Sequence, residues 1–485
     1  MIDVYSVENM RNADRNTIEN KTPSIELMKR AAHSVLEELD LSKKIYIISG
    51  SGNNGGDGIA LFKEMLDLGY APKLYLLSEK VSEDSNYFYE QVKYNLNVFN
   101  IKDCDYNADI IVDCILGTGF KGDVKDNVKQ VIENINKSNA YIVSVDIPSG
   151  LNGDNGIARC SIKANKTVAI QFAKYGHYLN DGKDYCGELV IKDIGIDKTV
   201  DDVFILEDKD ITLPHRFNNV NKGSFGRAVI IGGFKNYYGA IKIANMGLCA
   251  LRMGAGLNVI ACPKSMANVI GASVVESTIY PMQDKEAELV FNKEELEELL
   301  KMASAFAIGM GMGNTIENKK IISYILNNFE GPVLLDADGL NSLNGDVDII
   351  KNAKAKVIIT PHPKEFSRLT NIDVNSVLEN PVSCAQELAK DLNAVVLLKG
   401  ATTIICDKEK KYFMPFGGPS LAKGGSGDTL SGVILGFISQ GMDLIKSCYM
   451  SAYLCAKGAK RAEEEYSEYG VLASDVAKEI KYLLG

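Results

Sequence analysis

The start of the chain carries apolar side chains at the spacing of two amphipathic helices. In two stretches apolar residues recur every three or four positions, which places them on one helix face. The pattern predicts helices over residues 7–19 and 24–39. The second helix has an apolar face made of Ile25, Met28, Ala32, Val35, Leu36 and Leu39.

Short apolar runs then alternate with helical patterns. The runs predict strands over residues 45–49, 73–77, 109–114, 141–145, 163–171 and 187–194. Helices are predicted between the first four of these strands, over residues 56–68, 84–96 and 125–136. Because strands that alternate with helices form parallel, doubly wound sheets, we expect a Rossmann-like α/β domain.

A second alternating series begins in residues 225–233. A helix rich in small residues follows from Tyr238, and strands are predicted over residues 257–261, 305–308, 333–336, 357–360, 394–399 and 402–407. The stretch from Asp197 to about Pro214 is acidic and has no strong period. We therefore predict two α/β domains, over residues 1–205 and 206–485.

Composition and charge exclude several classes of protein. A net charge of −10 argues against unspecific binding of nucleic acid, whose phosphates require a basic surface. The ten cysteines include no Cys-x-x-Cys pair, which indicates reduced residues and not a zinc site or a disulfide framework. The start of the chain lacks the pattern of a signal peptide, and no apolar run approaches the length of a membrane span, so we expect a cytoplasmic protein without membrane contact.

Three loops of the first half carry unusual chemistry. Residues 50–58 match Gly-x-Gly-x-x-Gly, and Glu79 is spaced to bind a ribose hydroxyl, so an ordinary Rossmann cofactor site stays open. The asparagines and Asp57 of this loop offer hard oxygen ligands in addition. Residues 117–123 combine glycines with Lys121, a possible phosphate partner, and residues 146–150 follow a strand with a carboxylate and a hydroxyl. Each loop could be only a turn, but all three are expected at one sheet edge, where ligands bind.

The chemistry of the second half centres on residues 421–432. Gly424, Gly425 and Gly427 allow backbone N–H groups to surround an anion, and the apolar spacing from Thr429 predicts a helix whose positive end faces it. Asp428 is then a candidate general base that takes a proton from a hydroxyl about to meet a phosphoryl group. The alternative is a flexible turn with a capping aspartate.

Four other loops of the second half fit the same nucleotide site. Residues 309–313 permit close approach of a backbone, and residues 336–339 could hold a nucleotide phosphate through Mg²⁺ or cap a helix. His362 lies between two prolines, which indicates a presented polar group. Residues 399–403 form either a hairpin turn or a phosphate-binding lysine with backbone amides. No Gly-x-x-x-x-Gly-Lys-Ser/Thr sequence occurs, so this is not a P-loop enzyme.

The loops of the first half resemble the signature loops of the NAD(P)H-hydrate epimerase family. The resemblance implies a site for reduced nicotinamide nucleotide that carries a hydroxyl at C6 of its ring. It assigns substrate binding to Asn53, Asn54, Gly55, Gly56, Asp57, Gly117, Thr118, Gly119, Phe120, Lys121, Gly122, Asp123 and Asp146. It assigns a potassium ion to Asn54, Asp113 and Ser149, and Asp146 is the candidate acid or base for epimerisation.

Residues from about 220 to 485 are similar to the ribokinase-like, ADP-dependent NAD(P)H-hydrate dehydratase family. This resemblance implies that the hydrated nucleotide contacts Ala240, Gly311, His362 and Asp428. It assigns ADP to Lys399, Gly400, Ala401, Thr402, Thr403 and Gly427. The family pattern often has proline, glycine and threonine where this chain has Met310, Lys364 and Lys423. We expect Lys423 to change the affinity for the nucleotide.

Together the resemblances predict a bifunctional repair enzyme. The first domain converts the R epimer to the S epimer of NADHX or NADPHX. In the second, Asp428 deprotonates the C6 hydroxyl, which attacks the β-phosphoryl group of ADP, and loss of phosphate restores NAD(P)H and leaves AMP. K⁺ and Mg²⁺ are the expected cofactors, and a homo-oligomer is expected. The alternatives are a small-alcohol kinase fused to a non-catalytic binding module and a Rossmann oxidoreductase.

Overall fold

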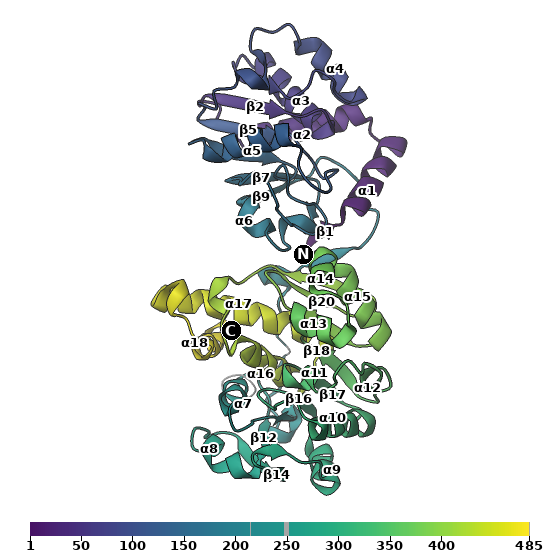
Figure 1. The fold of residues 1–485 in the computed structure, drawn as a ribbon, viewed down its shortest axis with the longest axis vertical. Coiled ribbons are helices and arrows are strands. Elements are labelled where there is room, and N and C mark those ends of the chain that lie inside the picture. The colour runs from purple at the N-terminus through teal and green to yellow at the C-terminus, as the bar shows by residue number, and fades with distance from the viewer. Residues whose placement is uncertain (214, 247–251, 485) are drawn as a thin grey trace. The chain divides into compact units, whose positions relative to one another are not determined.

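The computed structural model describes residues 1–213, 215–246 and 252–484. It divides into two compact units, one over Ile2–Phe204 and the other over Ile205–Gly485 together with Met1 (Figure 1). The predicted boundary after residue 205 lies one residue from this division. Among the described residues, no helix has both the length and the apolar character that a membrane span requires.

The first unit is a seven-stranded sheet in the order β4-β3-β2-β5-β6-β7-β9, with every pair of neighbours parallel. Its strands are β2 (Ile45–Ser49), β3 (Lys73–Leu76), β4 (Val98–Asn100), β5 (Ile110–Cys114), β6 (Tyr141–Val145), β7 (Lys166–Ile170) and β9 (Glu188–Lys192). Two short strands, β1 (Ile2–Tyr5) and β8 (Ala173–Lys174), pair in parallel beside it.

Helices cover both faces of this sheet. They are α1 (Val7–Asn20), α2 (Ser24–Leu36), α3 (Asn53–Asp67), α4 (Glu83–Val92), α5 (Asp126–Lys137) and α6 (Gly182–Cys186). Alternate residues of β2 enter different cores: Ile45 and Ile47 pack with α2 and α3, whereas Tyr46 and Ile48 pack with α5. This alternation is the consequence of the two-residue period of a strand.

One prediction for the first unit was wrong in a way that matters for the site. Helix α3 begins at Asn53 and not at residue 56, so the Asn-Asn-Gly-Gly segment is its first turn and not a loop. A Cβ atom on Gly55 would lie 2.1 Å from the carbonyl oxygen of Gly50, so this turn packs against the end of β2 more closely than a side chain permits. The glycines allow this close contact between the first turn of α3 and the end of β2. The spacing of the glycines in the sequence does not reveal the contact.

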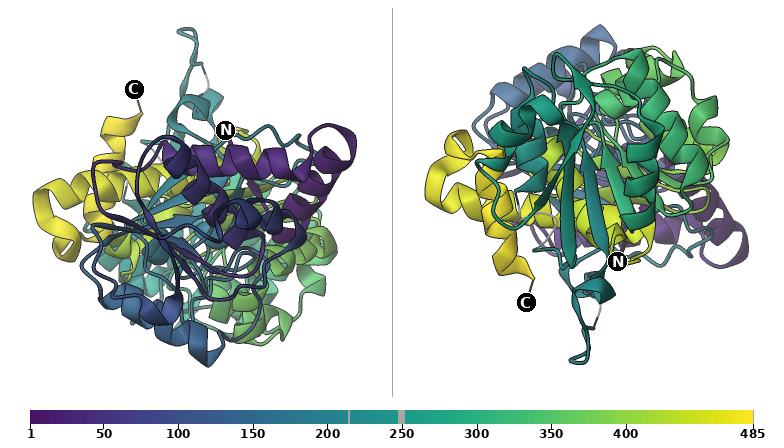
Figure 2. Two further views of the ribbon diagram at one scale, coloured as in Figure 1. Left: turned by 90° about the horizontal axis from the view of Figure 1, so that it is seen from above. Right: turned by 90° about the horizontal axis from the view of Figure 1, so that it is seen from below.

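The second unit is a sheet in the order β13-β12-β11-β16-β17-β18-β19-β20-β21. Its strands are β11 (Arg227–Ile231), β12 (Leu257–Pro263), β13 (Thr278–Met282), β16 (Ala305–Ile308), β17 (Pro332–Leu335), β18 (Lys356–Ile359), β19 (Val395–Leu398), β20 (Thr403–Cys406) and β21 (Lys411–Met414). Pairing is parallel as far as β19 and antiparallel from β19 to β21. In the view from below in Figure 2, the teal strands run side by side with green helices beside them.

The helices of the second unit are α7 (Tyr238–Asn245), α8 (Ala267–Gly271), α9 (Lys293–Met302), α10 (Ile316–Asn328), α11 (Asp338–Asn341), α12 (Asp348–Lys351), α13 (Pro363–Thr370), α14 (Val374–Glu379), α15 (Pro381–Leu392), α16 (Ser426–Ile438), α17 (Leu444–Gly470) and α18 (Ala473–Glu479). The chain also forms a short hairpin of β14 (Asp284–Lys285) and β15 (Glu288–Leu289), and strand β10 (Val203–Ile205) lies at the division between the units. Helix α16 is buried along most of its length and packs against α7, α17, β16 and β17. The sheet therefore fixes the start of α16 firmly in place.

Most cysteines lie in buried elements, as the sequence predicts. Six of the nine described cysteines are buried: Cys114, Cys186, Cys262, Cys406, Cys448 and Cys455. The tenth, Cys249, and Pro214, which ends the predicted boundary segment, lie outside the described residues. The buried thiols act as small apolar side chains in these cores.

Candidate functional site

The first candidate site is a cavity at the carboxyl ends of β2, β5 and β6. Its volume is about 570 Å³, and all three of the predicted loops line it. The predicted residues that line it are Asn53, Asn54, Asp57, Gly117, Thr118, Gly119, Phe120 and Asp146. Gly55 and Gly56 lie behind this wall, in the packed turn of α3. The strand order β2-β5-β6 therefore brings the three loops together.

The rest of the second loop points away from the cavity. Lys121 lies 3.7 Å from a carboxylate oxygen of Asp154, and Asp123 accepts a hydrogen bond from Arg159 at 3.0 Å. The side chains of Lys121 and Asp123 are 68% and 78% exposed. The structure does not bring Lys121, Gly122 or Asp123 into the cavity with the other predicted residues.

Asp146 is held by its backbone and by its carboxylate. Its φ is +65°, in the left-handed region. Its Oδ1 accepts hydrogen bonds from the N–H of Ile170, at 3.1 Å, and from the ammonium of Lys174. His177 donates from Nε2 to the carbonyl of Asp146 at 2.8 Å, since its Nδ1 accepts from the N–H of Lys174. The carboxylate is therefore fixed at the cavity wall.

Burial and the neighbouring lysine keep His177 neutral. Burial, and then the positive charge of Lys174, lower the pKa of His177 to about 4. A neutral ring with one donating and one accepting nitrogen is the form that both hydrogen bonds require. His177 therefore supports Asp146 without taking up charge.

Sequence reasoning missed the charged residues that enter this cavity from outside the three loops. Lys174 comes from β8, Arg11 and Asp14 from α1, and Asp84 from α4. The Lys174 side chain is 1% exposed. A lysine within the apolar segment that follows β7 was the one available signal, because a lysine is almost never buried without a partner.

The three predicted potassium ligands are linked through Ser149 and the carbonyl oxygen of Leu116. Asn54 donates from Nδ2 and Ser149 donates from Oγ to that oxygen, each at 3.1 Å. Ser149 also donates from Oγ to Asp113 at 2.5 Å. Burial raises the pKa of Asp113, although hydrogen bonds from Ser149 and Ser144 oppose the shift. In the described part of the chain, the buried Oδ1 of Asn54 has no hydrogen-bond partner.

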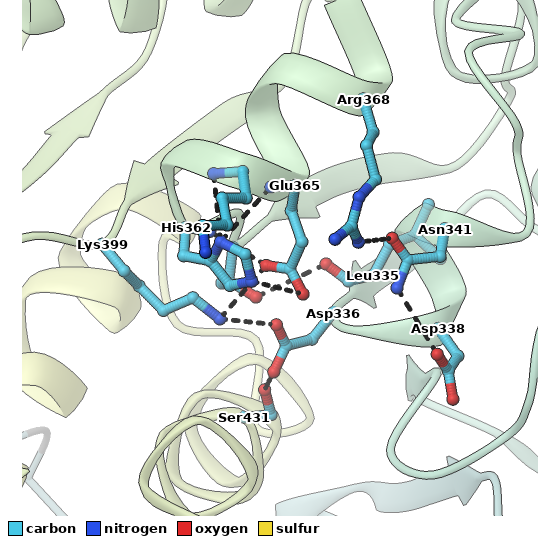
Figure 3. A network of polar contacts seen from close by, with 11 residues as sticks. Leu335, Asp336, Asp338, Asn341, His362, Glu365, Arg368, Lys399 and Ser431 are labelled. Atoms are coloured by element: carbon cyan, nitrogen blue, oxygen red, sulfur yellow. Dashed lines mark hydrogen bonds and ion pairs between the residues drawn. The ribbon is translucent and has the colours of Figure 1, made fainter. Parts of the chain in front are cut away.

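The second candidate site lies at the start of α16, at the carboxyl ends of β17 and β19 (Figure 3). Gly425 has a φ of +96°, which a glycine adopts at little cost, and it precedes the first helical residue, Ser426. Asp428 is in the first turn, where the free N–H groups of a helix favour negative charge.

A buried ion pair lies next to this turn. Lys399 donates to Oδ1 of Asp336 at 2.9 Å, and Ser431 donates from α16 to Oδ2 of Asp336 at 2.8 Å. A second carboxylate, that of Glu365, lies 3.8 Å from the same ammonium. A Cβ atom on Gly427 would lie 3.5 Å from Nζ of Lys399, so the glycine turn and the lysine are in contact range. Burial alone would lower the pKa of Lys399, but Asp336 and Glu365 raise it.

Asp428 titrates far from the ordinary range of a carboxylate. Burial, and then the negative charge of Asp336, raise its pKa to about 7, while Lys399 opposes the shift. A carboxylate with a pKa near neutrality can accept a proton and release it under physiological conditions. The pKa of Asp428 therefore lies close to neutrality.

The other predicted contacts with the hydrated nucleotide have defined positions. His362 is the N-cap residue of α13, because its Nδ1 accepts from the N–H groups of Lys364 and Glu365. Gly311 has a φ of +58°, and a Cβ atom there would lie 3.1 Å from that of Ala240, so these two residues are neighbours. His362 is a presented polar group, as the flanking prolines indicate.

The residues assigned to ADP connect β19 to β20. Lys399, Gly400, Ala401 and Thr402 lie between two antiparallel strands, so this segment is a hairpin connection, and Thr403 begins β20. Residues 399–403 therefore form a hairpin connection, and this conformation does not exclude binding of a nucleotide by the same residues. Asp336 does not cap a helix, because α11 begins at Asp338 with Ala337 at its N-cap position. The N-cap of α11 has no side-chain hydrogen bond, so the capping alternative for residues 336–339 was wrong, and Lys399 and Ser431 bind the carboxylate of Asp336.

The three departures from the family pattern have separate environments. Met310 is buried, Lys364 is exposed, and Lys423 donates to the carbonyls of Tyr469 and Val471 at 2.6 and 2.7 Å. Lys423 thus binds the junction between α17 and α18. Its ammonium is engaged by these carbonyls and not directed at an anion.

Comparison with known proteins decides between the alternatives. A family model described as NAD(P)H-hydrate dehydratase matches residues 228–482, and one described as YjeF-related protein N-terminus matches residues 24–176. The bifunctional NAD(P)H-hydrate repair enzyme Nnr of Coxiella burnetii is 30% identical over 501 residues, which cover 99% of each chain. That of Dictyoglomus turgidum is 31% identical over 507 residues, which cover 98% of this chain and 96% of its own.

The chain belongs to the family of bifunctional NAD(P)H-hydrate repair enzymes. This confirms the predicted function and both predicted activities, an epimerase in the first unit and a nucleotide-dependent dehydratase in the second. The small-alcohol kinase and the oxidoreductase were the wrong alternatives.

The fold of the dehydratase unit is also confirmed by a solved structure. The ADP/ATP-dependent NAD(P)H-hydrate dehydratase of Bacillus subtilis, co-crystallised with ATP and Mg²⁺, is 29% identical to this repair enzyme. The match has a TM-score of 0.50 and covers 58% of this chain and 97% of that chain. The second unit is therefore ribokinase-like, as the sequence predicts.

Proposed function

We propose that Asp428 is the general base of the dehydratase unit. The observation that carries this proposal is its pKa of about 7, beside the ion pair of Lys399 and Asp336. In the proposed step, Asp428 takes the proton of the C6 hydroxyl, whose oxygen then attacks the β-phosphoryl group of ADP. AMP is the leaving group of this transfer. The C6–O bond of the resulting phosphate ester then breaks with the help of the ring nitrogen's lone pair, phosphate leaves, and loss of a proton from C5 forms the C5=C6 double bond of NAD(P)H.

The start of α16 suits the negative charge that develops in this step. The N–H groups near Gly425 and Gly427 point out of the helix start, where the helix dipole favours an anion. His362, Gly311 and Ala240 are the proposed neighbours of the hydrated ring, and residues 399–403 with Gly427 those of ADP. We infer ADP as the co-substrate. Mg²⁺, which would neutralise the phosphates, has Asp338 as its one candidate ligand in residues 336–339, because Asp336 is bound to Lys399.

In the epimerase unit, we propose that Asp146 exchanges a proton with the substrate at C6. Its position in the cavity wall and its ion pair with Lys174 support this role. A potassium ion fits Asn54, Asp113 and Ser149, because the buried Oδ1 of Asn54 has no hydrogen-bond partner among the described residues and these oxygens suit a hard cation. The ion would supply positive charge that holds the loops around the substrate. The thiol-rich cores fit a reducing compartment, and we infer a cytoplasmic location.

Recovery of NADH absorbance from separated R and S epimers tests both assignments in the full chain. With Mg²⁺, K⁺ and ADP, the enzyme should convert both epimers to NADH. We expect Asp428→Asn to abolish recovery from both, and Asp146→Asn to abolish recovery from the R epimer only. Replacing K⁺ by a bulky organic cation should slow only the R epimer. Recovery from the S epimer by Asp428→Asn at the normal rate would rule out Asp428 as the base.

A further inference from the structure

Four carboxyl groups line the epimerase cavity, and those of Asp57 and Asp146 have opposite surroundings. The charged residues that line it are Arg11, Asp14, Asp57, Asp84, Asp146 and Lys174. Asp146 has a buried ammonium and a backbone N–H directed at its carboxylate. These contacts fix the position of the Asp146 carboxylate in the cavity wall.

Asp57 has no such support. Within the described part of the chain, its carboxyl group has neither a hydrogen bond nor an ion pair to another residue. It projects from the first turns of α3 into the cavity, where the charges of Asp146 and Asp14 oppose its ionisation. Lys174 is the nearby cation, but its ammonium is bound to Asp146 and to the carbonyl of Ile170.

The lack of a partner and the neighbouring negative charges both favour the protonated form of Asp57. Burial, and then the charge of Asp146, raise the pKa of Asp57 well above its ordinary value. A carboxyl group that holds its proton more strongly than usual is suited to act as an acid toward a bound substrate. Asp57 is such a group, whereas the carboxylate of Asp146 is held by Lys174 and a backbone N–H.

We propose that Asp57 is the general acid of epimerisation and Asp146 the general base, an inference that rests on the proposed role of Asp146. Asp57 donates its proton to the C6 hydroxyl, the C6–O bond breaks and water leaves. The lone pair of the adjacent ring nitrogen forms a C=N double bond. Water then adds to C6 from the opposite face and gives its proton to Asp146. Nothing is oxidised or reduced, and proton exchange with solvent restores both carboxyl groups.

The variant Asp57→Asn tests the acid in the full chain, because an amide keeps the shape of the side chain but cannot donate this proton. Without nucleotide the dehydratase cannot consume the S epimer, so conversion of R to S is measured directly. We expect the epimerase kcat to fall by about 10² to 10⁴, with the dehydratase rate on the S epimer unchanged. Asp67→Asn, at the exposed end of the same helix, is the matched control and should retain the epimerase rate.

Two further readouts separate acid catalysis from a structural effect. The wild-type kcat should fall at high pH as Asp57 loses its proton, and Asp57→Asn should lose this alkaline limb. In water enriched in ¹⁸O, each epimerisation should place one solvent oxygen at C6, above the uncatalysed exchange. An unchanged rate in Asp57→Asn, or epimerisation that retains the original oxygen, would overturn the inference. If Asp146→Asn abolishes epimerisation but Asp57→Asn does not, the proposed role of Asp146 stands and the inference about Asp57 fails. If both variants keep the wild-type rate, the proposed role of Asp146 fails as well.

Discussion

The ammonium of Lys399 and the carboxylate of Asp336 form a buried ion pair in the dehydratase unit, with Nζ and Oδ1 2.9 Å apart. The Asp336 side chain is 3% exposed, and Ser431 donates to its second oxygen. The pair therefore joins the hairpin after β19 to helix α16 from within the core. It also sets the electrostatic surroundings of Asp428.

Removing one charge of this pair should destabilise the second unit. The variant Asp336→Asn leaves the ammonium of Lys399, whose side chain is 23% exposed, with less compensation, and breaking a fully buried pair costs about 3 to 5 kcal/mol. We expect the free energy of unfolding to fall by about 3 kcal/mol in urea, followed by circular dichroism. Asp391→Asn breaks the exposed pair with Lys351 and should cost about 1 kcal/mol or less. Equal effects of the two variants would contradict a special role for the buried pair.

The dehydratase should depend on pH through Asp428. A general base acts in its ionised form, so kcat should rise with pH and reach half its maximum near pH 7, where burial and Asp336 hold the pKa. The rate of NADH recovery from the S epimer at saturating ADP measures this profile. A rate that stays constant from pH 5 to 9 would contradict it. The epimerase rate, taken without nucleotide, serves as the control for general effects of pH.

The raised pKa of Asp428 also predicts that its ionised carboxylate lowers the free energy of unfolding of the second unit. Its pKa is raised from 3.8 to about 7 in the folded protein, so stability is lost as the pH rises through this range. Asp428→Asn removes the charge and should therefore stabilise the second unit at pH 8, while it abolishes dehydration. The gain should disappear as the pH falls below about 3, where the wild-type group is neutral in both states. Urea unfolding at the two pH values checks the sign.

The close packing at the start of α3 predicts unequal effects of two neighbouring substitutions. A Cβ atom on Gly50 would lie 1.9 Å from the carbonyl oxygen of Ile115, whereas one on Gly52 would meet nothing within 4 Å. Gly50→Ala should therefore lower the stability of the first unit by about 2 kcal/mol or more. Gly52→Ala should change it by a few tenths of a kcal/mol. Thermal unfolding of both variants measures the difference, and similar losses would contradict it.

The strongly periodic parts of the fold were predictable from the sequence. Strands β2, β6 and β16 have the predicted bounds, because short apolar runs between turn residues define buried strands. The short strands β1, β4 and β8 were missed, since two to four residues carry too little periodicity. Strands β13 and β21 were also missed, because their partly exposed and polar residues interrupt the apolar pattern.

The site was predictable only where the chemistry is local. Asp428 and its glycines are contiguous, so their pattern carried the information, and the environment of Asp428 supports the proposed role. Asp57 and Asp146 were assigned by resemblance, but their difference in environment was not. This difference depends on Lys174. The pairing of β1 with β8, together with the packing of β8, brings Lys174 into the cavity.

The short segment from Lys174 to His177 holds Asp146 twice, by its carboxylate through the lysine and by its carbonyl through the histidine. A substitution in this segment removes one support at a time. An inserted or deleted residue would shift both supports together, because they lie within one turn of chain. The residues between Lys174 and His177 can therefore vary in type, but the length of the segment cannot. In a scan of single-residue insertions and deletions, we expect every such change in this segment to impair the epimerase.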